Sequence, residues 1–171
     1  MEATQNLPAF ENEQDRIIDL LDRHLASAID LQLRIRHALW NAEDPRLAET
    51  RELSATASEF QQFCDLIALR LRALGAVAEA AMQRTGVRSF LDPYPLVVSS
   101  DEEHISAIDR ALAKFRHSAR QARENAAGFR NQTTAALFGK LASAIDAQIW
   151  FLRSPHQGRA VDFRLLRTGG L

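Results

Sequence analysis

Few residues in this chain have the types and spacing that catalysis requires. His104, His117 and His156 are not spaced as ligands of one metal ion, and the single cysteine, Cys64, has no neighbouring histidine partner. The sequence also lacks a glycine-rich phosphate loop and the Gly-x-Ser-x-Gly turn of many hydrolases. Nucleotide-dependent and nucleophilic enzyme classes therefore have no support, and we expect Cys64 to be a buried packing thiol.

Arginines near the C-terminus form a candidate binding segment. Between residues 153 and 171, four arginines accompany a single aspartate: Arg153, Arg159, Arg164, Arg167 and Asp162. Guanidinium groups bind phosphate in a salt-dependent way. Arg159, Arg164 and Arg167 are therefore candidate DNA contacts. In the alternative interpretation, apolar residues such as Val161 and Phe163 pack the segment onto a neighbouring subunit.

The composition predicts a single all-α domain. Hydrophobic residues make up 46% of the 171 residues, while glycine and proline are scarce. The net charge of −1 gives the folded chain no overall basic field. One cysteine fits a reducing compartment, and neither a secretory signal nor a run of about 18 apolar residues is found. We therefore expect a cytoplasmic protein that does not cross a membrane.

Apolar residues recur at helical spacing over four long stretches, which predict four helices. The expected ranges are about 13–41, 45–74, 104–128 and 131–153. Asp44 and Pro45 suit the start of the second helix, and Ser100 with Glu103 forms a capping box before the third. Gly75 suits the end of the second helix.

The connection between the second and third helices is long. We expect a short extra helix from Ala76 to Arg84 and then a loop over 87–100, whose Pro93 and Pro95 exclude a continuous helix. Four long helices with one such crossover follow the plan of a ferritin-like four-helix bundle. The predicted organisation is an N-terminal tail over 1–12, the bundle over 13–153 and an arginine-containing tail over 154–171.

Motifs at four places between residues 15 and 153 resemble the Dps family, the DNA-binding proteins from starved cells. The first helix contains Ile29-Asp30-Leu31-x-Leu33 and Ala38-Leu39-Trp40-Asn41, and the second contains Asp65-x-x-Ala68-x-Arg70 followed by Ala73-Leu74-Gly75. The crossover contains Tyr94-Pro95-Leu96, and the last helix contains Thr134-Ala135-x-Leu137-Phe138 and Asp146-x-x-x-Trp150-Phe151-Leu152. Their order and compatible spacings make the combined match specific.

This resemblance implies a ferritin-like subunit that assembles into a hollow dodecamer. Members of the family oxidise Fe(II), usually with hydrogen peroxide, store the ferric mineral inside and often coat DNA. The resemblance also implies a di-iron site between two subunits. In that site, His ligands and an Asp from the first and second helices of one subunit face an Asp and a Glu from the second helix of the other.

The sequence departs from the family at these ligand positions. Leu39 replaces the first-helix His, and Leu69 replaces the second-helix Glu, so that Asp65 is the surviving family-type ligand. The remaining His and Asp positions fall at Thr50 and Ser54, or at Arg51 and Ala55 in the alternative register. Iron requires several oxygen and imidazole ligands. We therefore expect the usual ferroxidase centre to be lost.

Other features bear on iron. A replacement site is an alternative, and it would combine an acid with a histidine from this set: Glu49, Glu52, Glu59, His37 and His24. The start of the last helix, where the resemblance implies acid-lined pores for ions, instead carries Arg130-Asn131-Gln132. This change disfavours the entry of Fe(II).

Trp40 and Trp150 are expected in the core or in a subunit interface.

Three functional interpretations remain. The first is a Dps-like cage without ferroxidase activity that binds DNA, in which case it is associated with the nucleoid, or serves as a structural shell. The second is an active iron-storage ferroxidase with a rearranged site. The third is a ferritin-like interaction protein that forms a different oligomer or co-assembles with a paralogue.

Overall fold

A computed structural model describes residues 12–43, 51–95, 97, 98 and 100–153 of the chain, and of residues 51 and 52 it describes the backbone alone. The predicted C-terminal tail with Arg159, Arg164 and Arg167 lies outside the described residues, as does the predicted cap at Asp44-Pro45. Of the predicted N-terminal tail, Asn12 alone is described.

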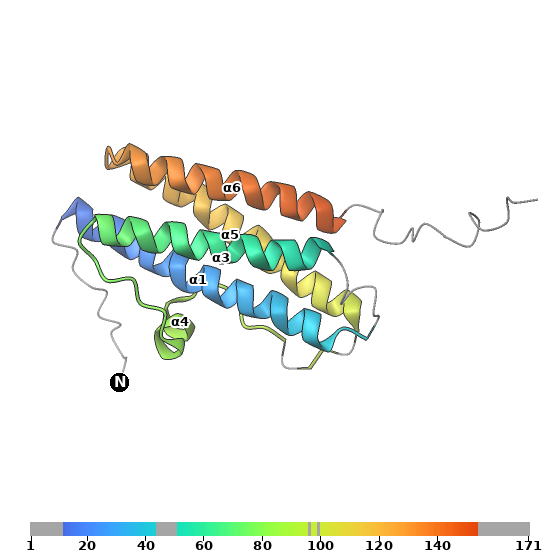
Figure 1. The fold of residues 1–171 in the computed structure, drawn as a ribbon. Helices are drawn as coiled ribbons and strands as arrows, with labels where there is room; N and C mark the ends of the chain where they lie inside the picture. Colours follow the sequence, from blue (N-terminus) through green and yellow to red (C-terminus); the bar gives the residue numbers. More distant parts are fainter. Residues whose placement is uncertain (1–11, 44–50, 96, 99, 154–171) are drawn as a thin grey trace, which may run out of the picture.

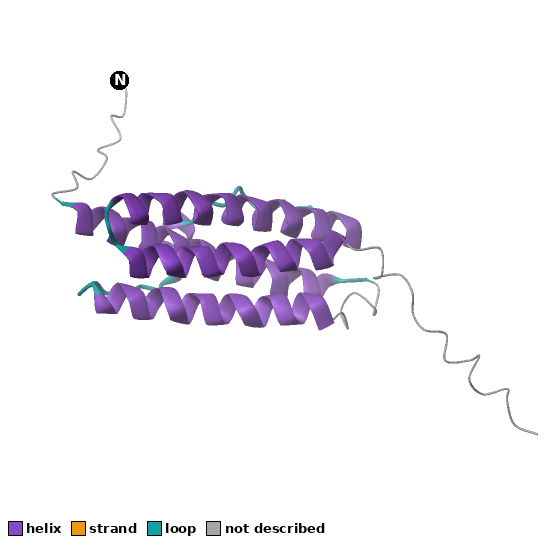
Figure 2. Ribbon diagram, turned by 90° about the horizontal axis from the view of Figure 1, so that it is seen from above, coloured by secondary structure: helices purple, strands orange, loops and turns teal. Residues whose placement is uncertain are grey.

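Four long helices form a bundle (Figure 1). They are α1 (Glu13–Asn41), α3 (Arg51–Ala73), α5 (Asp101–Gly128) and α6 (Gln132–Arg153). Helix α1 packs closely on α3 and α5 on α6, while contacts of α1 with α5 and of α3 with α6 join the two pairs. Among the described residues Figure 2 shows helices and loops alone, which confirms the all-α prediction.

Polar side chains satisfy backbone groups at the beginnings of these helices. The Ser100 hydroxyl accepts a hydrogen bond from the Glu103 N–H at 3.3 Å, so the predicted cap of α5 is present. Asn12 caps α1 and Asn131 caps α6, through side-chain oxygens 3.0 and 3.1 Å from the backbone nitrogens that donate to them. At the other end of α1, the helix stops at Asn41 as predicted.

Aromatic side chains fill the centre of the core. Phe60, Phe115 and Phe138 are completely buried, and the rings of Phe60 and Phe115 meet edge to face with centroids 5.5 Å apart. Burial of one such side chain contributes roughly 1.5–3 kcal/mol to stability. Cys64 is also buried here as expected, and burial together with the charge of Asp65 raises the pKa of its thiol to about 12.

The short crossover helix exists, but it lies further along the chain than predicted. Helix α4 spans Met82–Arg88, while residues 76–81 are not helical, so the prediction of a helix from Ala76 to Arg84 was wrong in position. Alanine propensity suggested the earlier range, but α4 forms where it packs on α1 and buries Thr85. Gly86 lies within α4.

Two arginines fix the crossover to its neighbours. Arg88 at the end of α4 forms ion pairs with Asp19 and Asp22 of α1, with a nitrogen–oxygen distance of 2.8 Å to Asp22. Arg34 of α1 donates a hydrogen bond to the carbonyl oxygen of Asp92 at 2.6 Å. The crossover is therefore tied to α1 at two places, Asp19 with Asp22 and Arg34, which are separated by about half the length of that helix, and both ties use charge-assisted hydrogen bonds.

Helix α6 has the length and hydropathy of a helix that could cross a membrane. Its apolar residues also have a place in the bundle, because Phe138, Leu141 and Ile145 are completely buried against the other helices. An apolar face of this kind is what a bundle helix needs to cover its core. The composition of α6 is therefore explained by its packing.

Candidate metal centre

Leucines occupy two positions at which the family resemblance implies a His and a Glu ligand. Leu39, near the end of α1, is half-buried and packs against the core. Leu69, on α3, is 62% exposed. An alkyl side chain offers no lone pair to a cation, so neither position supplies a metal ligand.

Asp65 lies one helical turn before Leu69 on the exposed face of α3. None of the ion pairs found between described residues involves its carboxylate, which agrees with a surface position. Ser54 and Ala55, the alternatives for a further ligand position, are exposed and provide neither imidazole nor carboxylate. Thr50 and the side chain of Arg51 lie outside the described residues.

His24 belongs to the core and is not available for a replacement metal site. Its Nδ1 lies 2.6 Å from the carbonyl oxygen of Leu20, and its Nε2 lies 3.1 Å from the hydroxyl of Ser118. The ring packs against Phe138, with centroids 4.6 Å apart. Desolvation lowers the pKa of His24 to about 4 despite these two hydrogen bonds, so the ring is neutral at pH 7. Both ring nitrogens of His24 are therefore engaged within the subunit.

Glu59 and His37, two other members of the replacement set, are not brought together either. Glu59 accepts a hydrogen bond from Gln148 of α6, in a network that also includes Thr56. His37 lies near the other side of α1, where its ring centroid is 5.4 Å from that of Tyr94 in the crossover. Glu49 and the side chain of Glu52 lie outside the described residues.

Within the described ranges, no group of three His, Cys, Asp or Glu side chains is arranged to hold a metal ion. Among the described side chains at the family's ligand positions, Asp65 alone is of a ligand type. A centre shared by two subunits would therefore receive one carboxylate from the described part of each. That is fewer ligands than a redox-active iron centre uses.

A histidine and tyrosine pair near the end of α1 was not identified from the sequence. The hydroxyl of Tyr94 lies 2.6 Å from Nδ1 of His104, and burial raises the pKa of Tyr94 above its ordinary value although Arg34 opposes the shift. His104 is buried, and its hydrogen bond with Tyr94 satisfies one nitrogen of the ring. The sequence could not predict this hydrogen bond, because Tyr94 lies in the crossover and His104 lies in α5. Their contact depends on the path of the crossover and not on a helical repeat.

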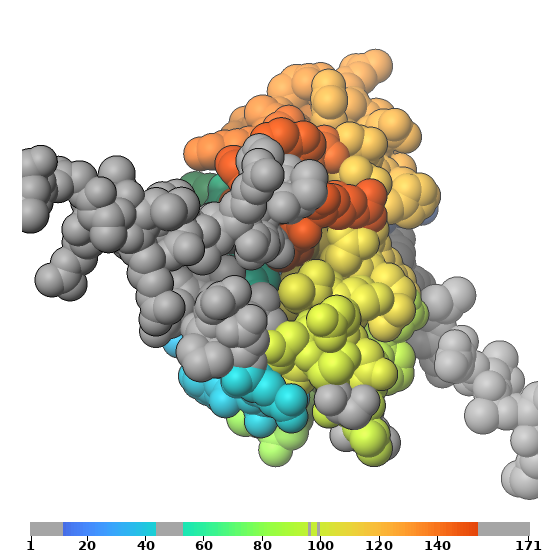
Figure 3. Space-filling model, turned by 90° about the vertical axis from the view of Figure 1, so that its right-hand side faces the viewer, coloured from blue at the N-terminus to red at the C-terminus, as the bar shows by residue number. Residues whose placement is uncertain are grey.

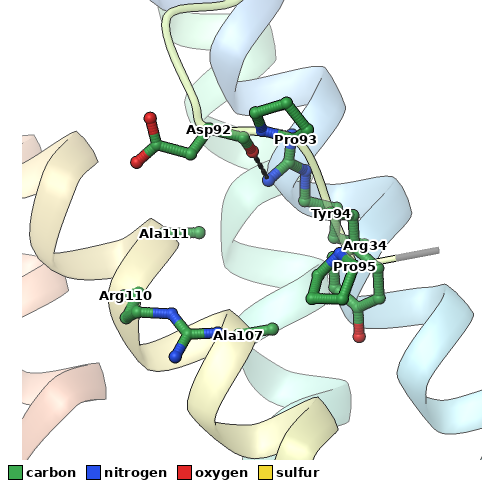
Figure 4. A pocket seen from close by; sticks show the side chains of 8 residues that line it. All are labelled: Arg34, Asp92, Pro93, Tyr94, Pro95, Ala107, Arg110 and Ala111. Atoms are coloured by element: carbon green, nitrogen blue, oxygen red, sulfur yellow. Dashed lines mark hydrogen bonds between the residues drawn. The ribbon is translucent and has the colours of Figure 1, made fainter. Parts of the chain in front are cut away.

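The pocket beside this pair is too small for a substrate. Arg34, Asp92, Tyr94 and Arg110 line a cavity of about 40 Å³, together with two prolines and two alanines (Figure 4). Ligand pockets of enzymes usually have volumes of about 300–1,000 Å³. Arg34 is also engaged already, because its guanidinium makes two bonds of 2.8 Å to Asp30. The cavity is suited to ordered water rather than to catalysis.

The two tryptophans are not in the core of the subunit. Trp40 is 74% exposed and Trp150 is 64% exposed, with the Trp150 ring against that of Phe151 at a centroid distance of 5.1 Å. The prediction of core packing was therefore wrong, and the prediction of a subunit interface stays. Helical spacing placed both residues near apolar stripes, but it does not distinguish the core from the surface of an assembly.

No protein-family model matches the sequence. A curated relative, the "DNA protection during starvation protein" of Agrobacterium fabrum, is 27% identical over 150 residues, which cover 87% of this chain and 93% of the relative. The fold is similar to the structure of Dps from Thermosynechococcus elongatus, with a TM-score of 0.77, 18% identity and coverage of 82% of this chain and 90% of that one. It is also similar to an archaeal Dps homologue from Halobacterium salinarum, with a TM-score of 0.77, 16% identity and coverage of 94% and 97%.

Four long helices with a single long crossover, as described above, define a ferritin-like bundle subunit. The match to the sequence relative covers most of both chains. In sequence and in fold, the chain is similar to proteins of the Dps family.

Proposed function

We propose that this protein is a cytoplasmic, cage-forming Dps subunit that has lost the family's iron-oxidation centre and acts by binding DNA or as a structural shell. The proposal combines the family with the departures at its ligand positions. The family supports a homo-oligomer, and we take the dodecamer as the expected assembly. Iron would be a substrate or cargo of the family's reaction, and under this proposal the chain does not oxidise it.

One observation carries the proposal. On the outward face of α3, a carboxylate at Asp65 is followed one turn later by the exposed alkyl side chain of Leu69. A pair of carboxylates on one helix face is thereby reduced to a single ligand. Leu39 on α1 removes an imidazole as well. Two such losses in each half of a shared centre leave too few ligands to retain and oxidise Fe(II).

The test is Fe(II) oxidation by purified protein of known assembly state, with oxygen and with hydrogen peroxide, against a protein-free blank. We expect the rates to equal the blank because too few oxygen and nitrogen donors converge. Appearance of the ferric absorbance reports the reaction. Fast, saturable oxidation would contradict the proposal and support an active ferroxidase with a rearranged site.

A matched variant then identifies the site of any activity. If the wild-type chain oxidises iron and Asp65→Asn abolishes the reaction, the rearranged site includes Asp65. Failure to form a dodecamer, or its formation only with a paralogue, would instead favour the interpretation as a ferritin-like interaction protein. The DNA-binding part of the proposal has a candidate segment in Arg159, Arg164 and Arg167. This segment stays a prediction that a deletion after Pro155 tests.

A further inference from the structure

The two parts of helix α5 carry opposite charge. Residues 101–109 include four acids and no arginine or lysine, whereas residues 110–128 have five basic residues against one acid. Asp109 pairs with Arg153 of α6, but Glu102 is exposed and takes part in none of the ion pairs found between described residues. The start of α5 therefore presents negative charge to the solvent.

A groove lies beside these acids, between the start of α5 and the last part of the crossover. It has a volume of about 370 Å³, and its lining residues are Pro95, Val97, Glu102, Glu103, Ser106 and Arg110. Glu102, Ser106 and Arg110 follow one another at intervals of four residues, so α5 turns them to the same side. On the crossover side, Val97 is 84% exposed. The groove thus combines an uncovered apolar wall with carboxylates.

Helix α6 ends next to this groove. The guanidinium of Arg153, its last residue, makes two bonds of 2.9 and 2.8 Å to the carboxylate of Asp109. Asp109 precedes Arg110 of the groove lining and lies about 10 Å along the helix from Glu102. Figure 3, which faces this end of the bundle, shows the end of α6 beside the start of α5 and the last part of the crossover. The ion pair therefore fixes the start of the C-terminal segment close to the groove.

The sequence of residues 154–171 complements the groove in charge and in hydrophobicity. Its basic residues and the first apolar residues between them are Arg159, Val161, Phe163, Arg164 and Arg167. An extended chain advances at most about 3.3–3.6 Å per residue, so the six residues from 153 to 159 reach about 20 Å. That is about twice the distance along α5 from Asp109 to Glu102. The first of these arginines can therefore reach the groove of its own subunit.

We propose that residues 154–171 dock in the groove at the start of α5 of the same subunit, with arginines against Glu102 and Glu103 and apolar side chains against Val97. A guanidinium and a carboxylate match each other through paired, charge-assisted hydrogen bonds. The covalent link through α6 raises the effective concentration of the segment at the groove. Contacts that would be weak for a free peptide therefore suffice to hold it.

Docking in the groove and binding to DNA exclude each other for this segment. Arginines that are paired with the carboxylates of α5 are withheld from phosphate groups, so the groove acts as an autoinhibitory contact. The docking itself is independent of the proposed function. Its effect on DNA rests on that function, because Arg159, Arg164 and Arg167 are also the candidate DNA contacts.

Cleavage of the tail by trypsin measures docking in the full chain, because a docked segment does not enter the active site of the protease. Three proteins are compared at low salt: the full chain, Glu102→Gln/Glu103→Gln and the control Glu13→Gln/Glu124→Gln. Mass spectrometry follows the loss of the tail. Urea unfolding reports the stability of each variant, and light scattering reports its assembly state.

The control makes the same change in net charge at the other end of the bundle. Glu13 and Glu124 are exposed, and Arg16 of α1 lies over the ring of Phe129 at the end of α5, which places these helix ends together. Glu13 also lies in the first turn of its helix, as Glu102 does, so both variants lose an acid from a helix start.

We expect the tail of Glu102→Gln/Glu103→Gln to be cleaved about 5-fold faster than that of the full chain, because two surface ion pairs are lost. The control should be cleaved at the rate of the full chain, and high salt should remove the difference between the proteins. Equal rates in the full chain and the groove variant would overturn the docking. Protection that disappears when the assembly dissociates on dilution would also overturn it, because the tail would then occupy a neighbouring subunit.

A second measurement separates the docking from the proposed function. Affinity for a short mixed-sequence DNA duplex is measured by fluorescence anisotropy on the same three proteins. We expect Glu102→Gln/Glu103→Gln to bind about 5-fold more tightly than the control, because a larger fraction of its tails is free. Faster cleavage without any DNA binding would support the docking and contradict the DNA-binding part of the proposed function. Equal DNA affinities of the two variants would overturn the autoinhibition.

Discussion

His24 shows how a residue type associated with metal sites becomes part of a core. Three phenylalanine rings surround it, and a carbonyl oxygen and a hydroxyl satisfy its two nitrogens. The low pKa of about 4 follows from desolvation, which those hydrogen bonds only partly offset. The residue therefore links stability to pH without any catalytic role.

We predict that acid destabilises the subunit through His24. The folded pKa of about 4 lies below the ordinary value of 6.5, so the unfolded chain binds the proton more strongly. Stability from this residue is complete above about pH 6.5 and is lost as the pH falls towards 4. At pH 5 the loss amounts to about 2 kcal/mol in the free energy of unfolding. Urea unfolding at pH 7 and pH 5 measures it.

Two variants separate His24 from other acid effects. His24→Gln should remove about 2 kcal/mol of the difference between pH 7 and pH 5, while lowering stability at pH 7 because the core packing is disturbed. His117→Gln changes an exposed histidine of α5 and should leave the difference as it is. An unchanged pH dependence in His24→Gln would mean that other groups cause the acid sensitivity.

At the level of single residues, the sequence predicted those properties that depend only on the type of side chain. Leu39 and Leu69 cannot bind a metal in any fold, and Cys64 was expected in the core because its helical position coincides with the apolar stripe. The hydrogen-bond partners of individual side chains were harder to predict. The burial of His24 and its bond to Ser118 depend on how α1 and α5 meet, which no local pattern records.

Among the elements, the crossover depends most on contacts with the rest of the fold. Residues 76–81 are not helical, and Val77 is 77% exposed, so few apolar contacts hold this part. Arg88 provides the nearest strong attachment, because it bonds to both Asp19 and Asp22. Asp22 is only 9% exposed, and its carboxylate has limited access to water if Arg88 is removed.

We predict that Arg88→Met lowers the free energy of unfolding by about 2 kcal/mol, since charge-assisted hydrogen bonds are lost and an acid is left largely unpaired. It should also speed cleavage by elastase near residues 76–81, because α4 separates more readily from α1. Arg84→Met is the matched control. Arg84 is more exposed, pairs with the exposed Glu79 at 2.8 Å and lies 3.8 Å from Asp22, so its loss should cost much less in the free energy of unfolding. Equal losses of unfolding free energy in the two variants would contradict the prediction.

The long helices were predictable because several local signals agree for each of them. Apolar spacing, the Ser100 cap and the stop at Asn41 all indicated the ends that are found. Helix α4 had one signal, the propensity of alanine, and the crossover follows its contacts with α1 instead. Propensity decides little in a segment of seven residues, because each helical residue contributes less than 1 kcal/mol.

For the whole molecule, assembly should be visible in the two tryptophans. Both are largely exposed on a single subunit, and large exposed aromatic side chains mark contact surfaces. We predict that their fluorescence emission lies at shorter wavelength in the assembled protein than in dissociated subunits, because burial removes water from the indole rings. Trp40→Phe and Trp150→Phe assign the shift to one residue. An emission spectrum that does not change on dissociation would place both residues outside the interfaces.

The sequence has five cations and no acid over residues 110–123, a local excess that the sequence analysis did not single out. The net charge of the whole chain, −1, does not reveal this local excess of positive charge. What the sequence did not provide was the number of charges that remain after pairing, because Asp92 and Asp146 come from other elements. The net excess depends on the fold, and helical spacing divides the five cations between two sides of α5, with Lys114 towards the crossover and Arg116 and Arg120 towards α6.

The division of charge also makes each subunit an electric dipole. Its positive end lies where the second half of α5 packs on α6. Most of its negative excess lies in residues 101–109 at the start of α5, which include four acids and no arginine or lysine, and a smaller part lies in residues 12–43. A polyanion within a Debye length, about 8–10 Å at moderate salt, exerts a torque on such a body before any side chain touches it. Subunits therefore rotate into a preferred orientation during approach, so salt acts on the rate of productive encounter as well as on the strength of the final contact.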